Sequence, residues 1–71
     1  MRFHIKIGDL IIYPNVSLTY ILSISPFNDE AVGLTLRNHF GAVFEKQFLY
    51  LPVLQAHIAD EICFIQSYDQ S

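Results

Sequence analysis

Alternating polar and apolar residues run through the first two thirds of the chain. Every second residue is apolar from Phe3 to Ile7, and a Gly-Asp pair then interrupts the alternation before an apolar run that ends at Tyr13. Comparable patterns follow in residues 18–25, 32–37 and 42–49. A period of two is typical of strands with one buried face, so the sequence predicts four strands here. The fourth alternates imperfectly, which indicates an edge strand or a β-bulge.

Turn-forming residues separate these predicted strands. Pro14 and Asn15 end the first strand, because proline cannot donate a hydrogen bond to a neighbouring strand. Residues 25–30, SPFNDE, form a loop rich in residues that favour turns. Residues 38–41, NHFG, form a compact hairpin turn in which Gly41 can adopt a positive φ. We therefore expect consecutive strands to be neighbours in the sheet.

The period changes near the end of the chain. Apolar residues recur at steps of three and four from Leu51 to Ile62, and Pro52 suits the first turn of a helix. The pattern predicts a short helix over residues 51–60 and a closing strand over residues 61–66.

The predicted elements make one domain over residues 1–66, followed by a polar tail over residues 67–71. The fold class is mainly β, because four strands in meander, a short helix and a fifth strand are the order of a five-stranded SH3-like barrel. An α+β fold is the alternative, in which one helix over residues 51–66 covers a four-stranded antiparallel sheet. The two folds differ in whether residues 61–66 form a strand or continue the helix.

Several segments resemble those of known small barrels. The opening FHIKIGDLIIYP, residues 3–14, is similar to the start of Tudor-like and KOW-like barrels. TYILSI and AVGLTLRN, residues 19–24 and 31–38, resemble their second and third strands, so the resemblance covers about residues 3–66. It implies an SH3-like barrel, and many small phage and mobile-element proteins are similar in length and layout. The chain lacks the basic residues and the second-strand glycine of the KOW pattern, which argues against RNA binding.

Charge is sparse and unevenly distributed. The chain has four Lys or Arg and seven Asp or Glu, which gives a net charge of -3. Residues 47–71 contain no Lys or Arg. Phosphate binding needs clustered basic side chains, so nucleic-acid binding is disfavoured and is kept only as the alternative function. That alternative requires all the basic residues to converge on one face: Arg2, Lys6, Arg37 and Lys46.

Catalytic and metal-binding chemistry has little support. Cys63 is the single cysteine, so no internal disulfide can form, and its apolar neighbours favour a buried, inert thiol on the same strand face as Ile65. His57 and Glu61 have the spacing of a hydrogen-bonded pair on one helix face, and the other histidines lie too far away in sequence for a typical zinc site. We predict no catalytic residue, no metal and no cofactor.

The free cysteine, the lack of a leader segment and the lack of a long apolar run favour a cytoplasmic protein.

An apolar fraction of 52% in a chain of 71 residues is more than a small core can hide completely. We therefore expect a non-enzymatic protein-interaction module, such as a small accessory or inhibitor protein of a phage or mobile element. Aromatic residues beside acids suit a partner with a basic patch, and an SH3-like layout would gather their loops near one end. The predicted partner-binding residues are Phe27, Asp29, Glu30, Tyr13, Tyr50 and, at the hairpin tip, Phe40.

The fourth strand is the predicted site of self-association. Its pattern puts apolar residues on both faces, with Phe44, Phe48 and Tyr50 on one and Val43, Leu49 and Leu51 on the other. A small barrel has one interior and cannot bury both sets, whereas a two-fold interface covers one of them. We expect a symmetric homodimer, or a partner that binds an equivalent face. The opposing interpretation is that the polar residues within this strand guard it as an edge.

Overall fold

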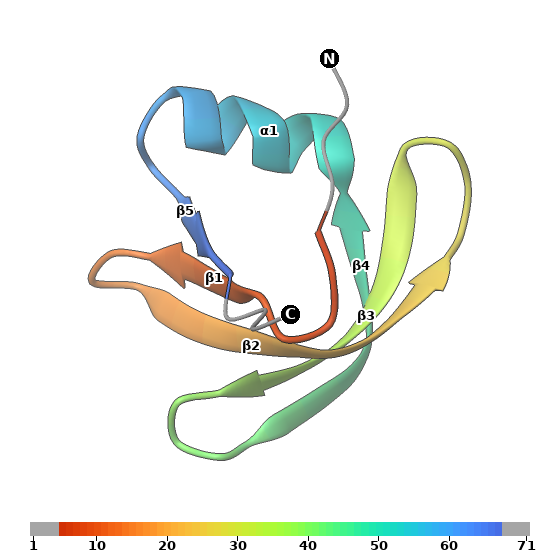
Figure 1. The fold of residues 1–71 in the computed structure, drawn as a ribbon, viewed down its shortest axis with the longest axis horizontal. Coiled ribbons are helices and arrows are strands. Elements are labelled where there is room, and N and C mark those ends of the chain that lie inside the picture. Colours follow the sequence, from red (N-terminus) through yellow and green to blue (C-terminus); the bar gives the residue numbers. More distant parts are fainter. Residues whose placement is uncertain (1–4, 68–71) are drawn as a thin grey trace.

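Five strands and one helix follow one another in the order that the sequence pattern predicts. The computed structural model describes residues 5–67. The elements are β1 (Leu10–Tyr13), β2 (Ser17–Pro26), β3 (Ala31–Asn38), β4 (Val43–Tyr50), α1 (Leu51–Ala59) and β5 (Phe64–Gln66). The mainly β class is confirmed, with a short helix before the last strand (Figure 1). The alternative helix over residues 51–66 is wrong, because α1 ends at Ala59 and Glu61 has a φ of 62°.

All five strands belong to one antiparallel sheet in the order β4-β3-β2-β1-β5. The long strand β2 lies at its centre, where it pairs with β1 on one side and with β3 on the other. The sheet curves strongly beneath α1 without closing into a barrel, so β4 and β5 are its two edges (Figure 1). Both edges therefore present backbone groups to the surroundings.

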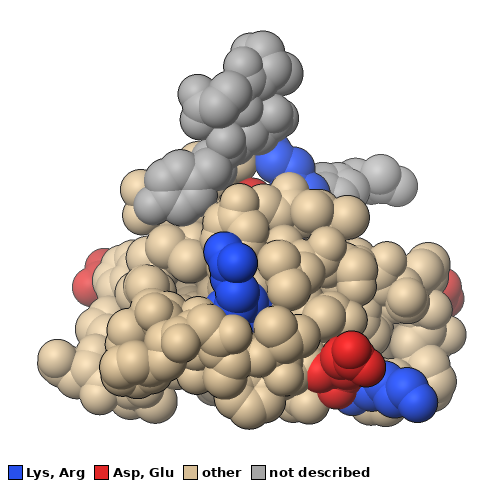
Figure 2. Space-filling view, turned by 90° about the horizontal axis from the view of Figure 1, so that it is seen from below, with Lys and Arg blue, Asp and Glu red and all other residues tan. Residues whose placement is uncertain are grey.

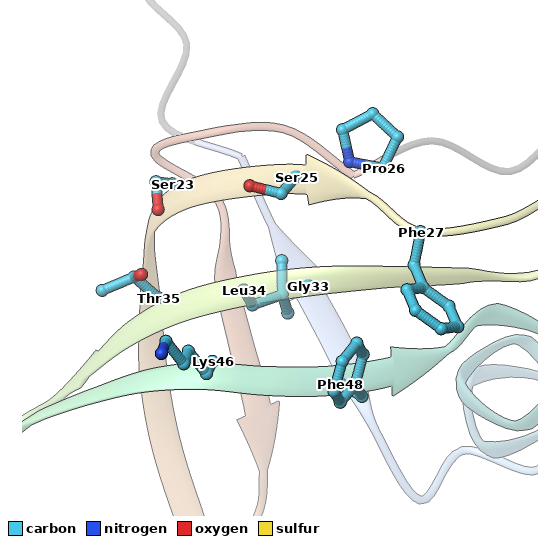
Figure 3. A pocket seen from close by; sticks show the side chains of 9 residues that line it. All are labelled: Ser23, Ser25, Pro26, Phe27, Gly33, Leu34, Thr35, Lys46 and Phe48. Atoms are coloured by element: carbon cyan, nitrogen blue, oxygen red, sulfur yellow. The ribbon is translucent and has the colours of Figure 1, made fainter.

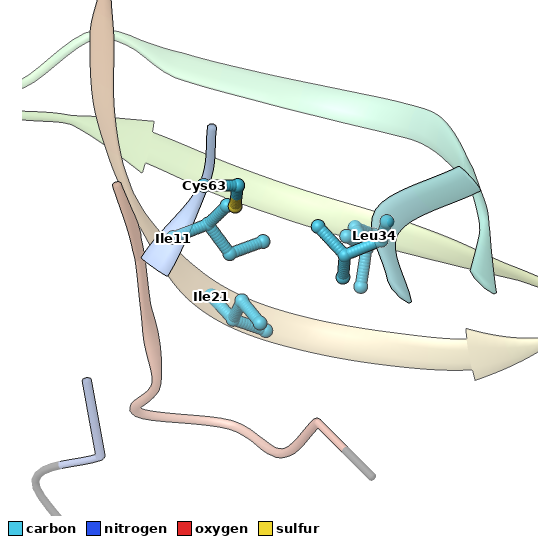
Figure 4. Packing of buried hydrophobic residues seen from close by; sticks show 5 residues of the cluster. Ile11, Ile21, Leu34 and Cys63 are labelled. Atoms are coloured by element: carbon cyan, nitrogen blue, oxygen red, sulfur yellow. The ribbon is translucent and has the colours of Figure 1, made fainter. Parts of the chain in front are cut away.

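The core lies between the concave face of the sheet and α1. Ile21 from the centre of β2 and Leu54 from α1 are fully buried, together with Cys63 just before β5. Ile11 from β1 and Leu34 from β3 complete the cluster (Figure 4). Because so few side chains are fully shielded from water, each of them carries a large share of the burial free energy.

The helix follows the predicted pattern closely, whereas the closing strand predicted over residues 61–66 is limited to Phe64–Gln66. α1 begins directly after β4, with Pro52 in its first turn, and ends at Ala59. Cys63 is buried, whereas its neighbours Ile62 and Phe64 are about half exposed, which confirms the predicted faces of this segment. α1 has nine residues, and no helix in the described part of the chain is long and apolar enough to cross a membrane.

The segment before β1 differs from the expected strand. The alternation from Phe3 to Ile7 predicts an extended segment, but residues 5–9 form no strand, and a tight turn precedes β1. Gly8 adopts a φ of 96°, a value that favours glycine. The expectation of a strand is thus wrong for the described residues, because the Gly-Asp pair folds into a turn; Phe3 lies outside them.

Hydrogen bonds tie this turn to the centre of the sheet. The Lys6 N–H donates to the Asp9 carboxylate at 3.0 Å, and the Asp9 side chain is buried. The Gly8 N–H donates to the Ile21 carbonyl oxygen, and the Ile21 N–H donates to the Asp9 carbonyl oxygen, both at 3.0 Å. The turn therefore extends the pairing of β2 beyond the end of β1.

The hairpin between β3 and β4 confirms the predicted turn at residues 38–41. The Asn38 side-chain oxygen accepts hydrogen bonds from the N–H groups of Phe40 and Ala42, both at 2.9 Å. Gly41 takes a φ of 92°. The turn chemistry of asparagine and glycine thus fixes where β3 ends and β4 begins.

Candidate protein-interaction surface

β4 is an exposed edge of the sheet. Within residues 5–67 it pairs with β3 alone, and seven of its eight residues are exposed. Four of these are large apolar side chains, namely Val43, Phe44, Phe48 and Tyr50. Single exposed apolar residues are common on soluble proteins, whereas a row of them along an unpaired edge is typical of an interaction site. β4 is therefore the first element of the candidate surface.

A β-bulge in the middle of β4 determines which side chains share a face. The pairing with β3 shifts by one residue between Phe44 and Gln47, so Glu45 and Lys46 both lie opposite Thr35. Lys46 accommodates the bulge with a φ of 59°. The sequence pattern predicts an edge or a bulge, and β4 has both. The predicted common face of Phe44 and Phe48 is wrong, because the bulge lies between them and puts them on opposite faces. Phe44 and Gln47 consequently share the inner face of the sheet, although they are three positions apart.

A hollow of about 280 Å³ lies on the outer face of β2, β3 and β4 (Figure 3). Its floor is a cross-strand row of Ser25, Gly33 and Phe48. Gly33 has no side chain, so the row is open at its middle; an added Cβ there would lie 3.7 Å from the Ser25 carbonyl oxygen, an ordinary contact. The other lining residues are Ser23, Pro26, Phe27, Leu34, Thr35 and Lys46. We call this site the Phe48 hollow.

Two aromatic rings close one end of the Phe48 hollow. Phe27 packs edge-on against Phe48 with ring centroids 4.9 Å apart, yet the two side chains remain 64% and 68% exposed. Lys46 lies at the opposite end, with the hydroxyl groups of Ser23 and Thr35 nearby (Figure 3). This arrangement can hold an apolar side chain of a partner against the rings, while the hydroxyl and ammonium groups bond to polar groups beside that side chain.

The loop beside Phe27 carries the predicted acidic residues. The Tyr50 hydroxyl donates to Glu30 Oε1 at 2.9 Å, and this hydrogen bond to a carboxylate raises the pKa of Tyr50. The Asn28 side-chain oxygen accepts from the Glu30 N–H at 2.8 Å and so shapes the loop. Asp29 is exposed in the same loop. Four of the six predicted partner-binding residues therefore lie at this end of the sheet.

Tyr13 and Phe40 lie away from this group. The Tyr13 hydroxyl is 2.9 Å from Nδ1 of His57, and the two rings pack in a T-shape. Phe40 is 83% exposed at the tip of the β3–β4 hairpin, and with Tyr13 it lines a separate hollow of about 390 Å³. The expectation that all these loops gather at one end is wrong, because the turns before and after the antiparallel strand β2 lie at its opposite ends (Figure 1).

The predicted pairing of His57 with Glu61 is not formed. α1 ends at Ala59, so Glu61 no longer follows the helical spacing, and His57 bonds to Tyr13 instead. In the part of the chain that the structure describes, no three or more His, Cys, Asp or Glu residues are grouped so that they could hold a metal ion.

The buried thiol of Cys63 is held in its neutral form. Burial raises the pKa of Cys63, and hydrogen bonding from Tyr13 and the Ile12 backbone offsets only part of that effect. Burial is also the main reason that the pKa of Tyr13 is raised, with Cys63 as the second cause. The predicted burial of this cysteine is confirmed. A thiolate nucleophile is disfavoured in such surroundings.

Native protein is expected to react with a disulfide reagent such as DTNB on the order of a hundredfold more slowly than urea-unfolded protein, because Cys63 must become exposed first. The release of the coloured product at pH 8 measures both rates. A Val16→Cys variant in a Cys63→Ser background is the control and should react at the full rate, since Val16 is 81% exposed. Immediate, complete labelling of the folded wild-type protein would contradict the inert thiol.

Basic side chains are spread over the described surface. Arg37 lies 5.6 Å from the centre of the Tyr20 ring and lines one hollow, whereas Lys46 lines another. On the face seen in Figure 2, the basic side chains lie apart from one another, and an acidic side chain lies beside one of them. Arg2 lies outside the described residues. This distribution does not favour nucleic-acid binding, which needs basic groups that converge on one path for phosphates.

The floor of the Phe48 hollow is the part of the candidate site that the sequence pattern does not predict. A signal is present, because small or polar residues occupy alternate positions of two strands: Ser23, Ser25, Gly33 and Thr35. They form one surface only through the register between β2 and β3, which shifts by one residue after Ile21. The sequence alone does not fix that register.

The chain shows no significant match to any protein-family model, curated protein or solved structure. The features from which a function can be inferred are therefore the exposed edge, the Phe48 hollow and the acidic loop beside it.

Proposed function

We propose that this chain is a non-enzymatic protein-interaction module that binds another protein through the Phe48 hollow and the adjoining loop of residues 27–30. The observation that carries the proposal is the contact between Phe27 and Phe48, which pack against each other at the surface although both stay about two thirds exposed. Rings held in this way need little further ordering when a partner binds. Aromatic anchors with a polar rim are typical of the centre of protein interfaces.

Charges around the hollow favour a partner that presents a basic patch to the loop. Glu30 is oriented by its hydrogen bond from Tyr50, and Asp29 is exposed beside it. A lysine or arginine of the partner can pair with these carboxylates and lie over the neighbouring aromatic rings. Lys46 at the opposite end would repel the same patch. The two ends therefore favour one orientation of the partner over the reverse.

We also propose that the fold is an open variant of the SH3-like barrel, as the sequence resemblance implies. The strand order β4-β3-β2-β1-β5 and the short helix before β5 support this assignment. A single small domain with one binding face suits an accessory or inhibitor protein, of the kind known from phages and mobile elements, which acts by covering a surface of its partner.

A Phe27→Ser variant is expected to lose the partner that the wild-type protein captures from a lysate of its native cells. Removing one buried phenylalanine from an interface costs about 1.5–3 kcal/mol, which corresponds to a roughly ten- to hundredfold weaker affinity. The domain should stay folded, because Phe27 is largely exposed. Capture by immobilised protein, followed by titration of the recovered partner, measures the loss.

The matched control is Val16→Ser, which removes an apolar side chain that is more exposed than Phe27 from the β1–β2 turn, at the opposite end of β2. It should bind the partner as the wild-type protein does. The proposal fails if no stoichiometric partner is recovered, or if Phe27→Ser binds as tightly as Val16→Ser.

A further inference from the structure

We propose that the free edge of β4 pairs with β4 of a second copy of this chain, in antiparallel orientation, across a two-fold axis at the bulge. This inference goes beyond the proposed function, because it assigns the backbone edge of β4 to a second copy of the chain, although Phe48 and Lys46 also line the Phe48 hollow. β4 is an eight-residue edge strand, and its outermost side has no neighbouring strand in the described part of the chain. The bulge determines what such a neighbour has to look like.

The faces of β4 follow from its partners on β3. Phe44 lies opposite Leu36, which packs against the core, so Phe44 belongs to the inner face. Phe48 lies opposite Gly33 and belongs to the outer face, where the Phe48 hollow is. Val43 lies on the other side of the bulge from Phe48 and is also on the outer face. Gln47 lies on the other side of the bulge from Phe44 and is also on the inner face. Successive residues thus alternate on each side of the bulge but not across it.

A regular strand cannot match this edge along its whole length. Its side chains alternate strictly, so they would match the faces of β4 on one side of the bulge and be reversed on the other. A strand with the same bulge, placed opposite it, matches both halves. The bulge therefore prevents regular strands from pairing along the whole edge. β4 of a second copy can pair with it, because it has the same bulge. This is why we assign the edge to the chain itself rather than to a foreign strand.

One register satisfies faces and charges together. When Glu45 of each copy lies opposite Lys46 of the other, two pairs of opposite charge form across the axis. Val43 then lies opposite Phe48 of the other copy on the outer face, and Phe44 lies opposite Gln47 on the inner face. A shift of one residue reverses the faces. A shift by two residues puts Glu45 opposite Phe48, and it puts the outward-facing Lys46 opposite an inward-facing residue.

The pairing has a consequence for the Phe48 hollow. The two-fold axis of an antiparallel pair runs perpendicular to the sheet, so the outer faces of both copies point the same way. The two hollows then lie on one continuous sheet surface, one on each side of the axis. A dimer of this kind presents two binding sites to the same side.

Charge exchange at the bulge tests the register. Sedimentation equilibrium of the full chain over nanomolar to high micromolar concentrations should show a mass that rises from 8.2 kDa toward twice that value. Glu45→Lys and Lys46→Glu should each weaken dimerisation by about tenfold or more, because each replaces two attractive pairs with two repulsive ones. The double variant Glu45→Lys/Lys46→Glu restores opposite charges and should dimerise within about threefold of wild type.

Glu61→Lys is the control for net charge, since it makes the same change as Glu45→Lys at an exposed position outside β4. It should leave the dimer unchanged, and far-ultraviolet circular dichroism verifies that each variant is folded. A constant mass of 8.2 kDa at high micromolar wild-type protein overturns the proposal. So does a double variant as weak as the single ones, or single variants as strong as wild type. Phe27→Ser should dimerise normally, so a failed dimer and a failed partner-binding site give different results.

Discussion

Replacing Leu54 with alanine is expected to lower the free energy of unfolding by about 2–5 kcal/mol. Leu54 is the fully buried residue of α1, and it contacts the cluster formed by the sheet residues. The shortened side chain would leave a cavity that the sheet cannot fill without moving. A domain of this size has about 4–10 kcal/mol of stability in total, so the variant should be close to unfolded at 37 °C. Urea titration followed by circular dichroism measures the change.

Val53→Ala is the matched control for this substitution. Val53 precedes Leu54 in the same helix but is about half exposed, so its truncation should cost well under 1 kcal/mol. Alanine also favours the helix as much as valine or more, so helix propensity does not explain a difference. Equal stability of the two variants would show that α1 does not pack on the sheet as described.

Replacing Gly8 with valine is expected to cost about 1–3 kcal/mol, because a β-branched residue does not tolerate a φ of 96°. The strain acts on the turn whose backbone bonds join Gly8 and Asp9 to Ile21. If the turn opens, the Asp9 carboxylate also loses its hydrogen bond from the Lys6 N–H. Thermal unfolding and the exchange rate of the Ile21 amide hydrogen measure the two effects.

Gly33→Ala separates backbone strain from the mere addition of a methyl group. Its Cβ would meet only ordinary contacts, and alanine suits a strand interior better than glycine by about 0.5–1 kcal/mol. The variant should be as stable as the wild-type protein or slightly more stable. A Gly8→Val variant with unchanged stability and unchanged exchange at Ile21 would show that the turn does not depend on the positive φ of Gly8.

The predicted strands and the helix agree with the structure where the apolar period was long and uninterrupted. The three- and four-residue steps around Leu54 place that residue in the core. The two-residue period of the second strand groups Ile21 with Ser23 instead, and that assignment is wrong because the register shift after Ile21 buries Ile21 on the same side as Ile24.

The strand predicted over residues 3–7 is wrong for the described residues 5–7, because the Gly-Asp pair at residues 8 and 9 forms a turn that overrides the alternation before it. Its predicted continuation from Leu10 to Tyr13 is confirmed as β1. Element type is thus recoverable from periodicity, whereas the ends of elements depend on single turn residues.

The candidate site was harder to predict than the fold. Phe27 and Glu30 could be found because aromatic and acidic residues in a loop have few roles in a core. The sequence did not show that Tyr13 lies apart from Phe27 and Glu30, since its position depends on which end of β2 each turn occupies. The row of Ser25, Gly33 and Phe48 depends on cross-strand register, and a bulge shifts that register by one residue. Features that depend on the pairing register between strands therefore cannot be predicted from this sequence.

A hydrogen–deuterium exchange footprint of the partner complex tests directly whether the partner binds in the Phe48 hollow. Binding through the Phe48 hollow should slow amide exchange in residues 25–30 and 46–50, which frame the rings of Phe27 and Phe48. Exchange at the β1–β2 turn and at the β3–β4 hairpin tip, around Val16 and Phe40, should stay as in the free protein. Protection confined to those two tips, with none in residues 25–30 and 46–50, would contradict binding through the Phe48 hollow.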